Sequence, residues 1–347
     1  MKLLIVTQAA DREDTNLGAF YYWFELLARH ASSVTIIASR VGTTDFPSNV
    51  EVYSLGKEKG YGKLRRLWRF WVFFARHFAH SDAVLFHQIP EFAIAAFPFI
   101  VGRKQTTALW YAHGGVSWRL HLAERLVDHV VTSSEAGFRL PSKKVHHVGQ
   151  AINTDLFSLA PHRPVSKKNP LSFVSVGRLS PVKDYETIIN ATALLRDTWD
   201  RAWTLTLVGS PITPGDFAYA EKIKAFVREK NLEDRIQFLG DRHYSEIPGI
   251  LKDHDIFLNA SRTGSLDKAV LEAMACGLSV LTSNDAYRAI LPAQYFIDRP
   301  SAEEFAARIK TLSKEKRPVA ELRDIVVRDH ALDRMVETMA HLLARPV

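Results

Sequence analysis

The sequence lacks the features that define several large protein classes. Its 347 residues include one cysteine, Cys276, so no disulfide can form within the chain and a reducing compartment such as the cytoplasm is favoured. No apolar run reaches the roughly 20 residues that a membrane helix needs. The most apolar later stretch, the expected helix at 92–101, contains Pro98, and the run at 1–8 is too short for a signal peptide. We therefore expect a water-soluble protein that can still touch a membrane.

Patterns for common metals and cofactors are also missing. No H-E-x-x-H or C-x-x-C occurs, so nothing in the sequence suggests a metal site of the zinc type. No G-x-G-x-x-G follows the first expected strand, which argues against a dinucleotide oxidoreductase. The stretch 56–63 resembles a phosphate-binding loop, but Leu64 stands where a magnesium-binding hydroxyl belongs. We expect neither a metal nor a cofactor.

Positive charge, by contrast, is in excess. There are 45 Lys and Arg against 38 Asp and Glu, a net charge of +7. Residues 1–157 hold 18 Lys and Arg against 13 Asp and Glu, so this part carries +5. Such a balance favours an anionic partner, namely a nucleotide, a phospholipid surface or a nucleic acid. No zinc-finger, RNP-type or basic-zipper pattern supports a nucleic acid, so we expect none.

Short apolar, β-branched runs alternate with helical patterns along nearly the whole chain. The expected strands cover residues 3–7, 34–38, 50–54, 83–87, 106–112, 129–132, 145–148, 172–176, 204–208, 236–239, 256–259 and 279–282. Such alternation specifies parallel sheets covered by helices on both faces. It restarts after an aperiodic, proline-containing segment, which predicts two doubly wound α/β domains facing each other across a cleft. We expect an N-terminal domain at 1–157, a linker at 158–170, a C-terminal domain at 171–314 and terminal helices at 315–347, the last of which can pack back on the N-terminal domain.

The strongest local signal is the loop after the expected strand at 172–176. The strand ends at Gly177, and Arg178 and Lys183 flank the short loop that follows, with Asp184 able to cap the next helix. Two cations fixed beside a helix start form a clamp for a diphosphate, because arginine supplies a fork and lysine a point charge. Two solvated surface cations would be the simpler interpretation of an isolated pair. The strand–glycine–arginine context favours the clamp.

A second signal is the loop after the expected strand at 256–259. It is polar, contains glycine and opens a helix, so its free backbone N–H groups form a candidate anion site. The residues of this candidate donor site are Gly264, Ser265, Leu266 and Asp267. Glu272, about one turn into the helix, is placed to accept both hydroxyls of a ribose. The alternative is a surface ion pair with Lys268, four residues earlier.

Together these stretches resemble the donor half of glycosyltransferase family 4, retaining enzymes with the two-domain GT-B fold. The resemblance covers most of residues 128–314. It rests on Gly177-Arg178-Leu179 with Lys183, on the segment 271–277, and on 131–134 followed by 152–157. It implies a GT-B fold with two Rossmann-like domains, an N-terminal one for the acceptor and a C-terminal one for the donor. It also implies that Arg178 and Lys183 hold the donor diphosphate and that Glu272 binds the ribose.

One departure concerns the donor sugar. The family usually has a second glutamate eight residues before the first, which reaches the hydroxyls of the donor sugar. Here that position is Gly264, and Thr263, Ser265 or Asp267 are the residues that can substitute.

The N-terminal half resembles the family less. The glycine-rich first loop of the family is reduced to residues 15–18, in which Gly18 at a helix entry can still approach phosphates closely. His113 matches the family histidine that lines the active site near the donor sugar. The alternative for His113 is a structural histidine at the end of a strand.

Residues 57–80 combine basic and aromatic side chains at helical spacing. The simpler interpretation is a core-packed helix with a solvated basic face. The other is an interfacial helix whose arginines meet anionic lipid while exposed aromatics insert, which would suit a lipid-linked acceptor. The residues concerned are Arg65, Arg66, Trp68, Arg69, Phe70 and Phe73.

The expected function is that of a retaining, metal-independent glycosyltransferase of the hexosyltransferase type. The donor is a nucleoside-diphosphate sugar, with UDP favoured over GDP, and the acceptor is a hydroxyl on a lipid-linked sugar or a growing polysaccharide. His113, Arg178 and Lys183 are the expected catalytic residues. We expect a cytoplasmic protein, with peripheral binding to the inner face of the membrane as an option. Two alternatives remain open: a sugar-nucleotide epimerase of the same fold, and a catalytically silent nucleotide-sugar-binding protein, which Gly264 motivates.

Overall fold

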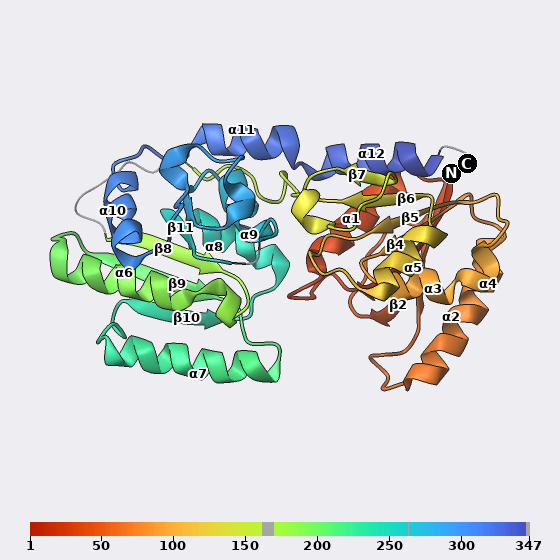
Figure 1. The fold of residues 1–347 in the computed structure, drawn as a ribbon, viewed down its shortest axis with the longest axis horizontal. Coiled ribbons are helices and arrows are strands. Elements are labelled where there is room, and N and C mark those ends of the chain that lie inside the picture. Colours follow the sequence, from red (N-terminus) through yellow and green to blue (C-terminus); the bar gives the residue numbers. More distant parts are fainter. Residues whose placement is uncertain (162–169, 263, 345–347) are drawn as a thin grey trace. The chain divides into compact units, whose positions relative to one another are not determined.

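The computed structural model describes residues 1–161, 170–262 and 264–344, and the chain divides into two compact units (Figure 1). Unit 1 contains Met1–Asn153 and Ala331–Val347, and unit 2 contains Thr154–His330. Helix α12 (Leu332–Ala344) therefore belongs to unit 1. Of the expected linker 158–170, residues 162–169 lie outside the described residues. Each unit is built on one parallel sheet, which confirms the expected α/β class.

The sheet of unit 1 has seven parallel strands in the order β3-β2-β1-β4-β5-β6-β7. They are β1 (Lys2–Ala10), β2 (Ser33–Val41), β3 (Val50–Ser54), β4 (Ala83–His87), β5 (Thr106–Trp110), β6 (His129–Thr132) and β7 (Val145–His147). Every residue of the central strands β4 and β5 is buried. This follows from helices on both faces of the sheet, which let a strand be continuously apolar.

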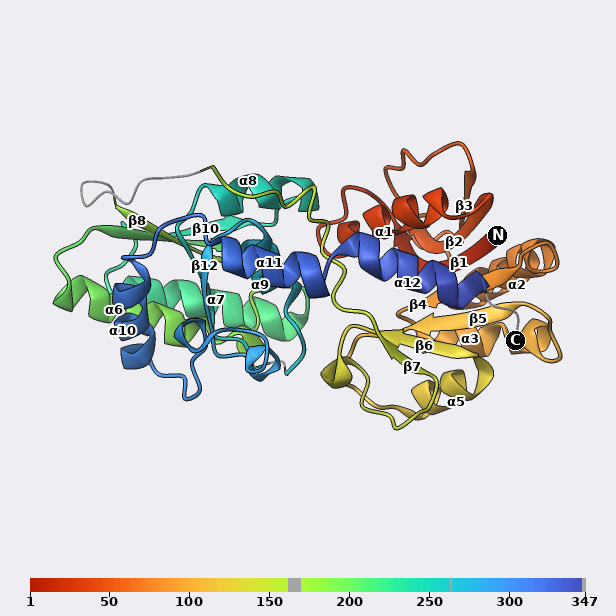
Figure 2. The same cartoon turned by 90° about the horizontal axis from the view of Figure 1, so that it is seen from above.

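The helices of unit 1 pack into two hydrophobic clusters. The first cluster contains residues of α1 (Gly18–Arg29) and α12, which contact each other and are drawn next to each other in Figure 2. The second contains residues of α2 (Lys63–Phe78), α3 (Pro90–Ala95), α4 (Phe97–Ile100) and α5 (Trp118–Leu126). Successive residues of one strand point to opposite faces, and Leu3 and Leu4 of β1 accordingly fall in different clusters.

Two expectations for unit 1 need correction. The helix expected over 92–101 is two short helices, α3 and α4, because Pro98 has no N–H to donate to the preceding turn. Phe70, one of the exposed aromatic residues in the interfacial interpretation of this helix, is only 2% exposed. It lies in the row of α2 that packs into the second cluster, four residues before Phe74. Phe73 is half-buried and Trp68 is exposed.

The sheet of unit 2 has five parallel strands in the order β10-β9-β8-β11-β12. They are β8 (Leu171–Val176), β9 (Trp203–Val208), β10 (Ile236–Gly240), β11 (Ile256–Asn259) and β12 (Ser279–Thr282). Its helices are α6 (Tyr185–Thr198), α7 (Pro214–Glu229), α8 (Ile247–Lys252), α9 (Lys268–Ala275), α10 (Ala302–Leu312) and α11 (Ala320–Asp329). Among the described residues, no helix is long and apolar enough to cross a membrane.

Both sheets have a point at which the strand order reverses. In unit 1 it lies between β1 and β4, and in unit 2 between β8 and β11. At such a point the connections after the two strands leave to opposite faces of the sheet, which opens a crevice beyond the carboxyl ends of the strands. The residues that follow β8 and β11 are therefore the first place to look for a ligand site in unit 2.

Candidate active site

Two loops meet at the carboxyl ends of β8 and β11. The first runs over residues 177–184 into α6, and the second over 260–267 into α9. The backbone N–H of Arg262 in the second loop donates to the carbonyl oxygen of Val182 in the first, at 2.8 Å. The strand order therefore brings together the two loops that were predicted separately from the sequence.

The side chain of Lys183 reaches the start of α9. Its Nζ atom is 2.8 Å from Oδ1 of Asp267, the residue that precedes the helix. The other carboxylate oxygen of Asp267 accepts a hydrogen bond from the side-chain amide of Asn259, at 3.0 Å. The two ionic side chains are 17% and 10% exposed, so the ion pair is largely removed from water. Asp267 thus holds the Lys183 ammonium at the amino end of a helix, where the helix dipole also favours an anion.

Arg178 follows Gly177 at the end of β8. Its Nε lies 3.6 Å from Oδ2 of Asp216, a buried residue in the first turn of α7. Burial alone would raise the pKa of Asp216, but hydrogen bonds from Thr213 and the Arg178 charge lower it more. The Arg178 side chain is 41% exposed, so the guanidinium is held at one edge and remains open to solvent.

Gly209, which follows β9, keeps the Arg178 loop in place. It has a φ of +126°, and a Cβ there would lie 2.2 Å from the carbonyl oxygen of Gly177 and 3.5 Å from the backbone nitrogen of Arg178. Only glycine allows this approach. Gly209 was not predicted as a site residue, and its position directly after a buried strand is the signal that marks it.

A third cation, Arg262, was not predicted. It pairs with the carboxylate of Asp184 across the two loops, and its side chain is 66% exposed. The expected capping role of Asp184 is wrong, since its carboxylate accepts no backbone hydrogen bond. It accepts instead from the hydroxyl of Thr187, at 2.9 Å. The backbone of Asp184 is left-handed, with a φ of +49°, which leaves its side chain free to face Arg262.

Glu272 lies one turn into α9 and is only 4% exposed. Its Oε1 accepts a hydrogen bond from the hydroxyl of Tyr244, at 2.9 Å. Burial raises the pKa of Glu272 to about 7, although the positive charge of Lys268 opposes this. Burial also lowers the pKa of Lys268. The alternative of a solvated surface pair is therefore wrong, because both groups are enclosed.

The segment before α9 explains the departure from the family pattern. Gly264 has a φ of +64°, a left-handed conformation that side chains other than glycine adopt at a cost. The carbonyl oxygen of Ser265 accepts a hydrogen bond from the side chain of Asn284, at 2.8 Å, and Leu266 is buried. Thr263, one of the three suggested substitutes, lies outside the described residues. Of the other two, Asp267 already binds Lys183 and Asn259.

His113 lies in unit 1, three residues after the end of β5, and it is exposed. Its Nδ1 accepts a hydrogen bond from the backbone N–H of Gly115, at 3.0 Å. A neutral imidazole that accepts at Nδ1 carries its proton on Nε2, so this nitrogen can donate to a ligand. The hydroxyl of Tyr111 donates to the carbonyl oxygen of Gly115, at 2.8 Å, and helps to fix the loop.

Gly18 is buried at the start of α1, as expected for a helix entry. The carboxylate of Asp14 accepts backbone hydrogen bonds from Asn16 and Leu17 and pairs with Arg40. This carboxylate occupies the turn that leads into the helix. Gly18 and His113 thus belong to unit 1, and Arg178, Lys183, Asp267 and Glu272 to unit 2.

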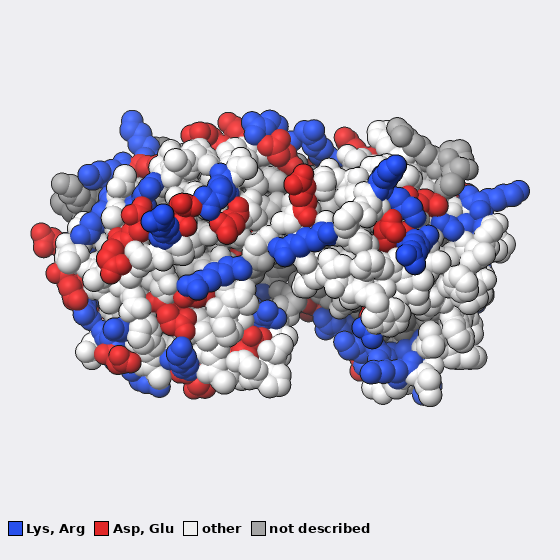
Figure 3. All heavy atoms as spheres, in the orientation of Figure 1, with Lys and Arg blue, Asp and Glu red and all other residues white. Residues whose placement is uncertain are grey.

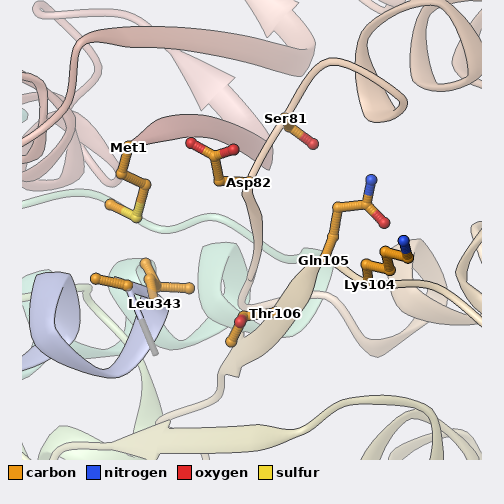
Figure 4. Close-up of a pocket in the computed structure, with 8 residues that line it drawn as sticks. Met1, Ser81, Asp82, Lys104, Gln105, Thr106 and Leu343 are labelled. Atoms are coloured by element: carbon orange, nitrogen blue, oxygen red, sulfur yellow. The ribbon is translucent and has the colours of Figure 1, made fainter. Parts of the chain in front are cut away.

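One hollow in unit 1, of about 560 Å³, lies at the edge of the sheet where its strands begin (Figure 4). It is lined by Met1, Ser81, Asp82, Lys104, Gln105, Thr106, Leu343 and Ala344. Asp82 accepts the backbone N–H of Lys2 there, at 2.7 Å, and both residues lie at the amino ends of strands. Ligands in parallel sheets bind at the carboxyl ends, so this hollow is not the candidate site. Within the described ranges, no three His, Cys, Asp or Glu side chains are grouped to hold a metal ion.

Comparison with known proteins gives a family match for part of the chain. Residues 160–327 match the family model of glycosyl transferases group 1. The amylovoran biosynthesis glycosyltransferase AmsK of Erwinia amylovora is 28% identical over 149 residues, which cover 41% of this chain and 34% of that protein. The D-inositol 3-phosphate glycosyltransferase of Corynebacterium glutamicum is 32% identical over 109 residues, or 31% of this chain and 26% of that protein. The chain thus matches less than half of the length of the curated relatives.

Solved structures match over the whole chain. HepE of Anabaena, solved in complex with UDP-glucose, superimposes with a TM-score of 0.74 at 19% identity and with 99% of each chain covered. Sucrose-phosphate synthase of Thermosynechococcus elongatus gives a TM-score of 0.75 at 17% identity, with 99% of this chain and 98% of that chain covered. At this level of identity the likeness shows the fold, and it confirms the expected GT-B class.

Proposed function

We propose that this chain, whose residues 160–327 match the family model of glycosyl transferases group 1, transfers a sugar from a nucleoside-diphosphate sugar to a hydroxyl acceptor. The observation that carries the proposal is the Lys183–Asp267 ion pair at the amino end of α9. Lys183 lies on the same loop as Arg178. The family match makes a sugar transferase the first choice for such a site. The positive charges make a diphosphate its natural ligand.

The proposed chemistry needs stabilisation of a leaving group. When the anomeric bond of the donor breaks, negative charge develops on the departing nucleoside diphosphate. Arg178, Lys183 and the backbone N–H groups of the first turn of α9 are fixed before the reaction, so they stabilise this charge without reorganisation. This supports a mechanism without a metal ion. Arg262 adds a third positive charge next to the same loop.

The stereochemical part of the proposal rests on the resemblance to family 4. Retention by attack on the same face requires no protein nucleophile, because the leaving phosphate itself takes the proton of the acceptor hydroxyl. His113 can then act on the donor sugar through Nε2, as a hydrogen-bond donor. The conformation of its ring is fixed by Gly115, which suits such a positioning role.

Glu272 is proposed to accept the ribose hydroxyls of the donor. Its position about one turn into α9, the helix that begins beside the Lys183–Asp267 pair, supports this role. We favour UDP over GDP as the nucleotide, and the complex of HepE with UDP-glucose supports that choice. The acceptor is proposed to be a lipid-linked sugar or a growing polysaccharide, in line with the amylovoran biosynthesis to which the name of AmsK refers. We place the enzyme in the cytoplasm.

A thermal-shift screen against UDP, GDP, ADP and their sugars tests the proposal. A ligand that binds only the folded protein raises its melting temperature. We expect the largest shift with UDP or a UDP-sugar, followed by release of UDP when an acceptor is added. No shift with any nucleotide would remove the proposal.

The second candidate is a protein that binds a nucleotide sugar without reacting. It is favoured by Gly264, whose left-handed backbone replaces the glutamate that the family uses on the donor sugar. A donor that binds but is neither hydrolysed nor transferred to a broad set of acceptors would support this candidate. Conversion of the donor sugar to its epimer without any acceptor would instead identify an epimerase.

A further inference from the structure

Helix α2 of unit 1 carries two apolar rows. One row packs into the second hydrophobic cluster and consists of Phe70, Phe74 and Phe78. The other is exposed and consists of Leu64 (84%), Trp68 (62%) and Val72 (42%). A helix turns by about 100° per residue, so rows offset by two residues point to nearly opposite sides. The exposed row is therefore a separate surface and not the margin of the core.

The neighbouring segment extends this apolar surface. Trp71 is 41% exposed, and its indole N–H donates to the carbonyl oxygen of Ala95 in α3, at 2.9 Å. Helix α4 packs on α2 through Phe99, whose ring lies 5.6 Å from that of Phe74. Two further residues at α4, Phe97 and Val101, are 51% and 62% exposed.

The same helix carries charge of one sign. Its 16 residues include Lys63, Arg65, Arg66, Arg69 and Arg76 and no Asp or Glu. Figure 3 shows Lys and Arg side chains gathered at the lower right of the molecule, over the position of α2. The nearby Glu58 is bound to the hydroxyl of Ser54.

Local contacts hold two of these arginines in place. The guanidinium of Arg65 stacks on the ring of Tyr61, at 3.6 Å, and Arg69 donates to the carbonyl oxygen of Ser54, at 2.8 Å. The cations therefore flank the exposed row with little loss of side-chain freedom on binding. A surface with these properties needs an anionic partner that can also bury apolar side chains.

We infer that α2 binds the surface of an anionic phospholipid bilayer. The row Leu64, Trp68 and Val72 enters the boundary between head groups and acyl chains, and the Lys and Arg side chains contact lipid phosphates. A nucleic acid would satisfy the cations but leave the apolar row in water. An anionic bilayer both pairs with the cations and buries the apolar row. This inference does not depend on the proposed activity, since binding is measured without donor or acceptor.

Flotation with lipid vesicles tests the inference. We expect the full-length protein to float with vesicles of phosphatidylcholine and phosphatidylglycerol but not with phosphatidylcholine alone. A triple variant, L64S/W68S/V72S, removes only exposed apolar groups and should bind at least about tenfold more weakly. The variant R65Q/R76Q should bind about 30-fold more weakly, since each basic residue near such a surface contributes about fivefold. Salt at about 1 M should weaken binding of the wild type.

Matched variants in unit 2 serve as controls. F217S/V327S removes exposed apolar side chains, and K314Q/K316Q removes two exposed charges. Both should float like the wild type. If the triple serine variant fails to fold, the flotation of R65Q/R76Q alone tests the inference. Three results would each overturn the inference: no flotation of the wild type, flotation of both α2 variants equal to that of the wild type, or loss of single-stranded DNA binding by R65Q/R76Q with vesicle binding unchanged.

Discussion

The Nζ atom of Lys183 lies 2.8 Å from Oδ1 of Asp267, although the two residues are 84 positions apart in the sequence. The pair joins the loop after β8 to the start of α9 and places a cation where the helix dipole already favours an anion. A diphosphate that binds here meets a preorganised charge. Asp267 is thus a positioning residue for Lys183.

Lys183→Ala should weaken both the fold and the site. It leaves the largely buried Asp267 carboxylate without its cation, so the free energy of unfolding should fall by about 1–3 kcal/mol. UDP should raise the melting temperature of the wild type but not that of the variant. Chemical denaturation measures the free energy of unfolding, and thermal melting with and without UDP measures the shift. An equal UDP shift in the two proteins would show that Lys183 does not contact the nucleotide.

Gly209→Ala should disturb the Arg178 loop. The new Cβ would lie 2.2 Å from the carbonyl oxygen of Gly177, so backbone must shift, and we expect a loss of about 2–4 kcal/mol. Gly240→Ala is the matched control. It also has a positive φ, of +72°, but a Cβ there has nothing within 4 Å. If the two variants lose the same stability and bind UDP equally well, Gly209 has no role beyond its own conformation.

The fold itself was largely predictable from the sequence. Every expected strand is present, because parallel strands covered on both faces are continuous apolar runs between polar loops. β1 extends to Ala10, beyond the expected end at residue 7, since Ala9 and Ala10 still pair with β2. The two loops of the candidate site could be found because each directly follows such a strand.

The partners of the site residues could not be predicted. Which carboxylate faces Lys183, Arg178 or Arg262 depends on the strand order and on side-chain directions, not on spacing along the chain. Helix α2 posed a similar problem. Both of its sides are apolar, so periodicity alone could not tell the buried row of Phe70 from the exposed row of Trp68.

The pH dependence of stability should reveal Glu272. Its pKa is raised to about 7 from the ordinary value of 4.5, so between these values the folded state binds more protons than the unfolded state. Stability contributed by this group is therefore present at the acidic end and lost as the pH rises through about 7. Glu272→Gln should remove this loss, on the order of 3 kcal/mol at about 1.4 kcal/mol per pKa unit.

Denaturation of wild type and Glu272→Gln across that pH range measures the difference. The exposed Glu229 on α7 offers a control, and Glu229→Gln should follow the wild type at every pH. A constant difference between wild type and Glu272→Gln from acidic to neutral pH would contradict the assignment of a buried, proton-binding carboxylate.

His113→Ala should separate chemistry from nucleotide binding. The proposed contact of His113 is with the donor sugar, so UDP affinity should stay the same while the rate of transfer falls by about 100-fold or more. Calorimetry with UDP and a turnover assay give the two values. A parallel loss of UDP affinity and rate would assign His113 to the nucleotide instead.

The most direct test of the central claim is calorimetric titration of UDP into the wild type and Arg178→Ala. Arg178 is 41% exposed and held at its edge by Asp216, so its removal should leave the fold intact. Loss of a charge-assisted contact to the diphosphate should weaken UDP binding by about tenfold or more and nearly abolish transfer. Unchanged affinity and unchanged turnover in the folded variant would contradict the account.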